Sequence, residues 1–256
     1  MQQDIVIFAP HQDDEILGAY EIIRQQPEHT YVVFLTNGDY EGAEVAKTRW
    51  HESRKALTHL GVPEDHMIAL GYADTGMPRE VSFLWRLWQE GDQTLVPSHV
   101  GAHTYHPDGG TEYHLAHWGA HAAYTRLAVL ADVRGVLEDI RPGTIYVTNE
   151  DDVHGDHAAA PLFVRAVIDQ MADYTPTIYR YHVHGGDDER WPNRTGDVFE
   201  KPLNLDESQW ESRVSVPVED QKDFLETLES FQSQWRDAEY MTAFIKKEQV
   251  FYREKK

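Results

Sequence analysis

The sequence has no cysteine among its 256 residues, which excludes disulfide bonds and thiolate chemistry. Any bound metal ion must therefore be held by histidine and carboxylate side chains. A chain without cysteine is also compatible with a reducing compartment, and we expect a cytoplasmic protein.

Long apolar runs are also absent, since no stretch approaches the roughly 18 residues that cross a bilayer. The N-terminal residues lead straight into a short apolar run, without the basic segment and long apolar core of a secretion signal. We therefore expect a soluble protein with no membrane insertion.

Basic residues are scarce: 23 lysines and arginines face 44 aspartates and glutamates, which gives a formal net charge of −21. Such a charge repels phosphate backbones and anionic lipid surfaces, so we expect no nucleic-acid partner. Most of the acidic residues are expected to form a solvated surface. The 15 histidines stand out against this background, and many of them occur in clusters.

The first of these clusters follows the apolar run Ile5–Phe8, which predicts a strand, and precedes apolar residues at helical spacing. His11, Asp13 and Asp14 therefore occupy a loop at the carboxyl end of a strand, where open α/β sheets bind ligands. One imidazole and two carboxylates supply mixed ligands for a metal such as zinc, with one carboxylate left as a base. The alternative is that Asp13, Asp14 and Glu15 only cap the helix.

A second loop of this kind follows the apolar stretch 144–148 and precedes a helical segment. His154 and His157 lie at its end, where one can act as a ligand and the other as a donor. The alternative, helix capping by Asp156 with exposed histidines, loses weight because two such loops meet at one sheet edge. Asp74, in the loop after another predicted strand, is expected at the same edge.

Strands and helices alternate along the chain, which points to a parallel sheet covered by helices. Apolar runs predict strands at 31–35, 66–70, 144–148, 177–184 and 212–216. Helical periodicity predicts helices at about 43–60, 81–88, 119–139, 158–172 and 218–235, with a surface loop at 185–204. No repeat, low-complexity tract or linker divides the chain, so we expect one domain over residues 1–256.

The histidine-rich segment 99–121 begins in a long loop and ends in a predicted helix. His114, His117 and His121 are spaced to share one helix face and could hold a second metal. We favour the simpler interpretation that they line a polar surface, and the role of the segment stays open.

Residues Ala9–Glu15 and His154–His157 resemble the two signature motifs of the PIG-L (LmbE-like) zinc-dependent N-deacetylase family. The first motif departs from the usual Ala-His-Pro-Asp-Asp-Glu, because Pro10 stands before the histidine and Gln12 after it. The spacing between the motifs is similar to that of the family, as are segments at 49–61, 71–76 and 231–234. The resemblance implies an α/β fold: a Rossmann-like three-layer sandwich with a mostly parallel sheet and an active site at the carboxyl ends of the strands.

The resemblance also implies a metal site. Zinc would be held by His11, Asp14 and His157, and another divalent metal such as Fe²⁺ would fit the same kind of ligands. Three protein ligands leave a position open for catalysis, which a purely structural zinc site would not do.

Two catalytic and two binding roles follow from the same resemblance. Asp13 would be the general base that activates water, and His154, as an imidazolium, would stabilise the oxyanion that forms during amide hydrolysis. Arg49 and Asp74 match positions that contact sugar hydroxyls in family members.

The leading hypothesis is a hydrolase that removes the N-acetyl group from a small glycoconjugate or oligosaccharide containing N-acetylglucosamine and releases acetate. The alternatives are an amidase that cleaves a larger acyl group from an aminosugar conjugate, and a non-catalytic module that binds a metal or a sugar. A nucleotide-binding oxidoreductase is disfavoured because no Gly-x-Gly-x-x-Gly follows the first strand. The proton donor to the leaving amine, with His184 and Asp152 as candidates, and homo-oligomer formation stay open.

Overall fold

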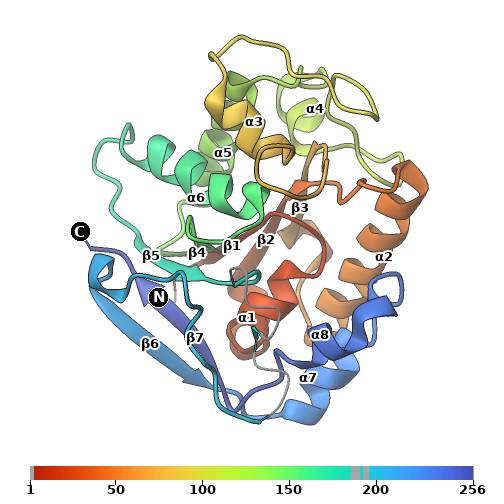
Figure 1. Ribbon diagram of the computed structural model, residues 1–256. Helices are drawn as coiled ribbons and strands as arrows, with labels where there is room; N and C mark the ends of the chain where they lie inside the picture. The colour runs from red at the N-terminus through yellow and green to blue at the C-terminus, as the bar shows by residue number, and fades with distance from the viewer. Residues whose placement is uncertain (1–2, 186–190, 193–195, 256) are drawn as a thin grey trace.

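A seven-stranded sheet with the order β3-β2-β1-β4-β5-β7-β6 forms the centre of the protein (Figure 1). This computed structural model describes residues 3–185, 191–192 and 196–255. The strands are β1 Ile5–Ala9, β2 Thr30–Thr36, β3 Met67–Tyr72, β4 Thr144–Thr148, β5 Thr177–Tyr181, β6 Ser212–Pro217 and β7 Glu248–Arg253. Strands β1 to β5 pair in parallel, whereas β7 pairs antiparallel with both β5 and β6. The expected mostly parallel α/β sheet is therefore confirmed.

Helices cover both faces of this sheet. They are α1 Asp14–Gln25, α2 Ala43–Leu60, α3 Phe83–Gln89, α4 Tyr113–Trp118, α5 Arg126–Ile140, α6 Gly155–Ile168, α7 Gln221–Leu228 and α8 Ala238–Thr242. Short 3₁₀ turns lie at Pro27–His29, Glu64–His66, Glu207–Gln209 and Trp235–Asp237. No helix in the described part of the chain is both long enough and apolar enough to span a bilayer.

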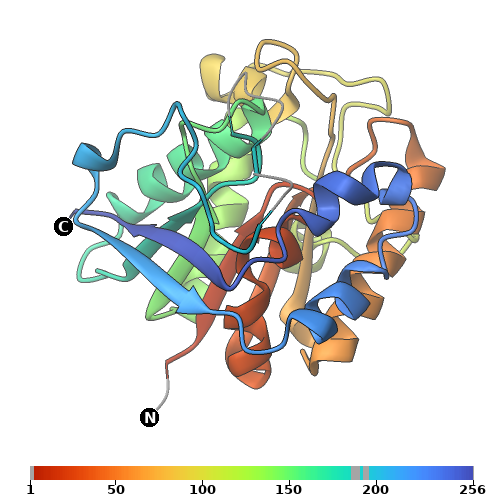
Figure 2. The ribbon, with the colours of Figure 1, turned by 60° about the horizontal axis from the view of Figure 1, so that its bottom comes forward.

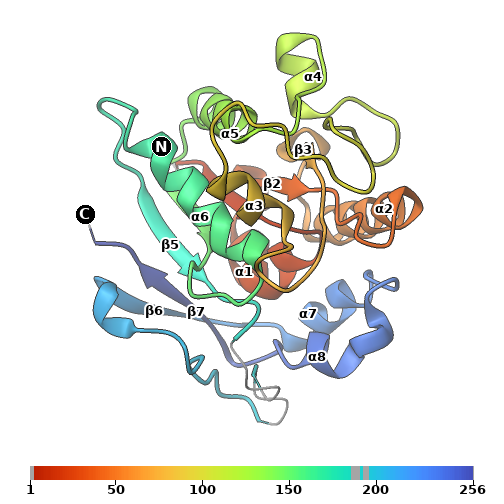
Figure 3. The same ribbon diagram turned by 45° about the horizontal axis from the view of Figure 1, so that its top comes forward.

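The alternation of side chains along each strand divides the interior into two cores. Ile7 of β1 packs into the core beneath α1, α2, α7 and α8, and its neighbour Phe8 packs into the opposite core beneath α3, α5 and α6. Figures 2 and 3 show the two helical layers on either side of the sheet. The three-layer arrangement follows from strands that are apolar on both faces.

The strand order reverses at β1, because the chain runs outward from β1 to β3 on one side and from β4 to β5 on the other. In such sheets a crevice opens at the carboxyl ends of the two strands that flank the reversal. The loop at 10–13 leaves β1 at this point, and the loop at 149–154 leaves β4 beside it. The topology therefore brings both sequence motifs to one place.

Close packing between α1 and β5 fixes the first of these loops. A Cβ atom on Gly18 of α1 would lie 2.2 Å from Cδ2 of Tyr181, so only glycine permits this approach. The Tyr181 hydroxyl donates a hydrogen bond of 3.0 Å to the Phe8 carbonyl of β1. The start of α1, which carries Asp14, is thereby held against the strands that form the crevice.

The prediction of one long helix at 119–139 is wrong about where the helix begins. Helix α4 ends at Trp118, Gly119 adopts a left-handed φ of 79°, and α5 begins only at Arg126. The side chain of Thr125 caps α5 by accepting a hydrogen bond from the Ala128 amide. His121 therefore does not share a helix face with the histidines of α4, as the spacing had suggested.

The C-terminal third also departs from the expectation. Strand β6 extends to Pro217, and the expected helix at 218–235 is limited to α7. The apolar residues of β7 are flanked by charged residues, so the pattern did not indicate this strand. Strand β5 ends at Tyr181, before the two histidines included in the expected strand. Residues 186–190 and 193–195 of the expected surface loop lie outside the described residues.

Candidate metal centre and substrate pocket

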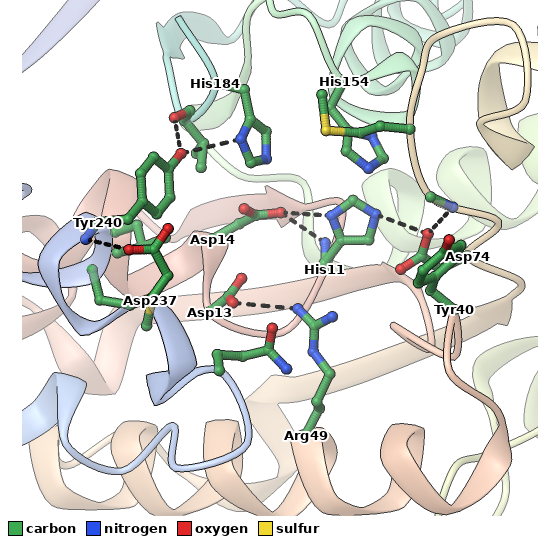
Figure 4. Close-up of a pocket in the computed structure, with 16 residues that line it drawn as sticks. His11, Asp13, Asp14, Tyr40, Arg49, Asp74, His154, His184, Asp237 and Tyr240 are labelled. Carbon is green, nitrogen blue, oxygen red and sulfur yellow. Dashed lines mark hydrogen bonds and ion pairs between the residues drawn. The ribbon is translucent and has the colours of Figure 1, made fainter. Parts of the chain in front are cut away.

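A cavity of about 430 Å³ opens at the crevice between the two motif loops. Its floor carries the residues of the first motif, and Figure 4 shows His11 at the centre with Arg49 below it. His154 and His184 lie above His11, and the segment that includes Tyr240 forms one side. Of the seven residues to which the resemblance gave a role, His157 alone does not line this cavity, because its side chain is fully buried behind it. Of the two candidate proton donors, His184 lines the cavity and the buried Asp152 does not.

Three of these residues form a compact triangle of ligand atoms. His11 Nδ1 lies 3.3 Å from Asp14 Oδ2 and 3.1 Å from His157 Nε2, and Asp14 Oδ2 lies 3.1 Å from His157 Nε2. Four ligands around zinc at 2.0 to 2.1 Å in a tetrahedron are separated from one another by about 3.3 to 3.4 Å. The triangle has the size and the ligand atoms that a tetrahedral metal ion requires.

A carboxylate lies next to the second ring nitrogen of each of the two histidines, and this supports rings that turn their first nitrogen toward the triangle. His11 Nε2 lies 3.2 Å from Asp156 Oδ2, and His157 Nδ1 lies 3.2 Å from Asp152 Oδ2, although the angle at His157 is poor for a hydrogen bond. Asp152 is held in turn by the backbone amide of His184, which donates to it at 2.9 Å. Metal-bound histidines usually place their second ring nitrogen against a carboxylate in this way.

The charges in the triangle also suit a cation. Burial acts to lower the pKa of His157, but Asp14 and Asp152 outweigh it and raise this pKa to about 9. Burial acts to raise the pKa of Asp14, but His157 and His11 outweigh it and hold this pKa well below its usual value. A metal ion that displaces protons from the histidines would therefore enter a site already arranged around a carboxylate anion.

Two wider sets of side chains could also hold a metal: His11, His154 and His157, or His11, Asp74, His154 and Asp156. Both sets require His154 as a ligand. However, His154 Nδ1 caps α6 by accepting a hydrogen bond of 3.2 Å from the Asp156 amide. The neutral ring then carries its proton on Nε2, which makes that atom a donor and not a ligand. We therefore favour the triangle that contains Asp14.

The environment of His154 favours the neutral imidazole over the imidazolium that we expected. Burial, and then the neighbouring His11 and His157, hold its pKa well below its usual value. The Nε2–H group of a neutral imidazole can still donate a hydrogen bond to an oxyanion. The role of His154 as a hydrogen-bond donor to the oxyanion stays a prediction, and it does not require the charged ring.

Asp13 lies beside the triangle but outside it. Its carboxylate Oδ2 is 3.3 Å from Arg49 Nη2, and its backbone has a left-handed φ of 118°, which is strained for a residue with a side chain. Burial raises the pKa of Asp13 to about 7, against the opposing charge of Arg49. Asp13 makes no side-chain capping hydrogen bond to α1, so the capping alternative is wrong for this residue.

The two expected sugar-binding residues both line the pocket. Arg49 Nη2 also donates to the Gln12 carbonyl at 2.7 Å, so its orientation is fixed by the first motif. Asp74 Oδ1 accepts a hydrogen bond of 2.7 Å from the Gly76 amide and lies 3.8 Å from His11 Nε2. The side chain of Gln12 donates to a backbone carbonyl in β2, away from the triangle.

The three histidines considered for a second metal contact three different carboxylates. His114 Nδ1 lies 2.7 Å from Asp132, and His121 Nδ1 lies 3.1 Å from Glu112. His117 Nδ1 lies 3.6 Å from a third carboxylate, that of Asp139. Among the described residues, the groups able to hold a metal include none of these histidines.

Several pocket residues were not identified from the sequence. Tyr40 and Met77 come from loops after β2 and β3, and Tyr240 and Met241 come from α8. Tyr240 donates a hydrogen bond to the Val183 carbonyl, and its hydroxyl lies 3.1 Å from Nδ1 of His184. Motif spacing carries no signal for such residues, because they reach the pocket only through the tertiary fold.

In a comparison with known families, the family described as PIG-L, GlcNAc-PI de-N-acetylase, matches residues 6–168. A comparison with curated proteins gives no significant match.

Solved structures with the same fold cover nearly all of the chain. The zinc-inhibited form of teicoplanin deacetylase has a TM-score of 0.60 and 12% identity, over 98% of this chain and 97% of that one. N,N'-diacetylchitobiose deacetylase from Pyrococcus horikoshii has a TM-score of 0.56 and 14% identity, over 98% of this chain and 83% of that one. The 4-carboxy-2-hydroxymuconate hydratase from Pseudomonas putida KT2440 has a TM-score of 0.54 and 11% identity, over 99% and 95%. At these identities the likeness shows a shared fold, and the reaction must be argued from the site.

Proposed function

This chain belongs to the PIG-L family, and from this membership we propose that it is a metal-dependent hydrolase of N-acetylated aminosugars. In this proposal it removes the N-acetyl group from a small glycoconjugate or oligosaccharide that contains N-acetylglucosamine, and it releases acetate. We further propose that residues 1–256 act as one catalytic domain, because β6 and β7 extend the same sheet that carries the motif loops.

The observation that carries the proposal is the triangle of His11, Asp14 and His157, with contacts of 3.1 to 3.3 Å between ligand atoms. We propose zinc as the metal, because two imidazoles and one carboxylate are ligands that it prefers, although Fe²⁺ accepts the same set. Such an ion would act as a Lewis acid on the amide carbonyl and would lower the pKa of water.

Asp13 supplies the base in this proposal. Its carboxylate lines the pocket beside the triangle, and a pKa of about 7 suits a group that must accept a proton near neutral pH. The charge of Arg49 favours the ionised form that the reaction needs.

His154 supplies a donor for the developing oxyanion. Because its Nδ1 accepts from the backbone of α6, its Nε2–H is available to the substrate oxygen. A donor of this kind is typically worth about 2.7 to 4 kcal/mol in the transition state. Arg49 and Asp74 supply a cation and a carboxylate to the same pocket, where sugar hydroxyls can both accept and donate.

Acetate release from a panel of N-acetylglucosamine derivatives tests the proposal. The zinc-loaded protein should release acetate, a chelator should abolish the reaction, and added zinc should restore it. N-butyryl analogues in the same panel test the amidase alternative, which predicts that they are preferred. If protein with a full complement of zinc or Fe²⁺ releases no acyl group from any member, the proposed function is wrong.

A further inference from the structure

Two large side chains stand exposed at the mouth of the pocket. Tyr40 is 60% exposed and Met77 is 48% exposed, yet both line the cavity that contains the metal ligands. Figure 4 shows Tyr40 next to Asp74, at the end of the pocket opposite Tyr240. Exposed apolar groups that continue a pocket often mark a surface for part of a ligand.

Gly76 holds the tyrosine ring in this place. A Cβ atom on Gly76 would lie 2.7 Å from both Cδ2 and Cε2 of Tyr40, so the ring rests directly on the glycine. Gly76 has a left-handed φ of 73°, and its amide donates a hydrogen bond to Oδ1 of Asp74. Tyr40 thus packs on Gly76, and Met77 follows Gly76 in the chain and lines the same cavity. We call these three residues the outer lip, and it lies next to a carboxylate proposed to bind the sugar.

The charges around the pocket limit what can lie on the outer lip. Four carboxylates line the cavity: those of Asp13, Asp14, Asp74 and Asp237. Among the described residues that line it, Arg49 is the one arginine or lysine, and its Nη2 already contacts Asp13 and the Gln12 carbonyl. A phosphate group on the outer lip would lie next to the Asp74 carboxylate in a protein of net charge −21, and the described lining residues offer it no lysine and no second arginine.

We infer that the preferred substrate is an aminosugar joined to an uncharged ring, and that this ring packs by its apolar face against Tyr40 and Met77. The inference rests on the proposed function and specifies the rest of the substrate. A pyranose or an aryl group offers such a face, whereas a phosphate-linked group lacks it and is repelled. Tyr40 is then a specificity-determining residue outside the reacting centre.

Specificity ratios test the inference. For the zinc-loaded protein, kcat/KM should be higher for the phenyl glycoside of N-acetylglucosamine and for N,N'-diacetylchitobiose than for free N-acetylglucosamine. It should be lowest for N-acetylglucosamine 1-phosphate. In Tyr40→Ala the ratio of phenyl glycoside to free sugar should fall about 2- to 13-fold, the usual worth of one aromatic contact. Tyr40→Phe keeps the ring and should keep the ratio.

Trp118→Ala is the matched control, because Trp118 is also an exposed aromatic residue, at 46%, but does not line the pocket. It should leave the ratio unchanged. A preference for the 1-phosphate, or an unchanged ratio in Tyr40→Ala, would overturn the inference.

A measurement of substrate binding distinguishes a failure of this inference from a failure of the proposed function. If no sugar in the panel is deacetylated, the proposed function fails, and calorimetric titration of the phenyl glycoside decides the role of the outer lip. Weaker binding by Tyr40→Ala than by the native protein and Trp118→Ala supports it. Equal binding, or no binding to any of the three proteins, overturns it.

Discussion

Arg49 Nη2 lies 3.3 Å from Asp13 Oδ2, so a cation from the middle of α2 faces the carboxylate at the start of α1. The same nitrogen donates to the Gln12 carbonyl at 2.7 Å. Both groups are largely buried, which strengthens the interaction relative to a surface ion pair. Arg49 thus opposes the effect of burial on Asp13, besides any contact with the sugar.

We predict that Arg49→Met shifts the pH dependence of the reaction. Loss of the cation raises the pKa of Asp13 further, and Asp13 must be ionised to accept a proton, so the acidic limb of the kcat/KM profile should move to higher pH. Activity should fall more at pH 6 than at pH 9. Arg49→Lys keeps a positive charge, so its acidic limb should lie between those of the native protein and Arg49→Met. Identical acidic limbs in all three proteins would argue against this electrostatic role.

Asp13→Asn and Asp14→Asn should have different effects. Asp13→Asn cannot accept the proton, so turnover should fall by roughly 10² to 10⁴ while bound zinc is retained. Asp14→Asn removes a member of the ligand triangle, so it should lose zinc. Elemental analysis together with acetate release checks both variants, and the reverse pattern would exchange the two roles.

Asp152→Asn should weaken metal binding without touching a ligand atom. The Asp152 carboxylate faces Nδ1 of His157 at 3.2 Å, and loss of such a partner typically lowers metal affinity by about 10- to 100-fold. Asp132→Asn is the matched control, since Asp132 is a buried carboxylate 2.7 Å from His114, outside the pocket. Competition with a chelating dye measures both affinities, and equal losses in the two variants would indicate a general effect on the fold.

Gly18→Ala should destabilise the fold. The new methyl group would lie 2.2 Å from Cδ2 of the buried Tyr181, and overpacking of this kind typically costs about 1 to 3 kcal/mol. Gly91→Ala is the control, because its nearest neighbour would be Thr94 Oγ1 at 3.3 Å. Urea unfolding should give a change of at most about 0.5 kcal/mol for the control. Equal midpoints for both variants would show that α1 can move away from β5.

The placement of the proposed metal-site residues at one edge of the sheet could be predicted from the sequence, because it depends on local order. A buried strand, a loop with His11 and Asp14, and a helix form one continuous segment, and the second loop repeats the pattern before His157. Parallel pairing of β1 with β4 then suffices to bring the two loops together. Propensity and periodicity predict the two strand-loop-helix segments, whereas the choice of His11, Asp14 and His157 as ligands is what the resemblance to the family implies.

The remaining parts depended on contacts that no local pattern encodes. The boundary between α4 and α5 required Gly119 and Thr125 to be recognised as a stop and a cap within an apparently helical run. Strand β7 is set by pairing with both β5 and β6, which are distant in sequence. Tyr40 and Tyr240 reach the pocket from opposite ends of it, and each is placed by packing and not by a motif.

The walls of the pocket have two separate origins along the chain. Its proposed metal ligands and the outer lip lie within the segment 6–168 that matches the family, whereas Val183, His184, Tyr240 and Met241 come from beyond it. Substitutions in this later segment can alter what the cavity admits while the ligand triangle stays intact. A change in what the cavity admits can therefore arise in either part of the chain, at the outer lip or in these later walls, without any change in the ligand triangle.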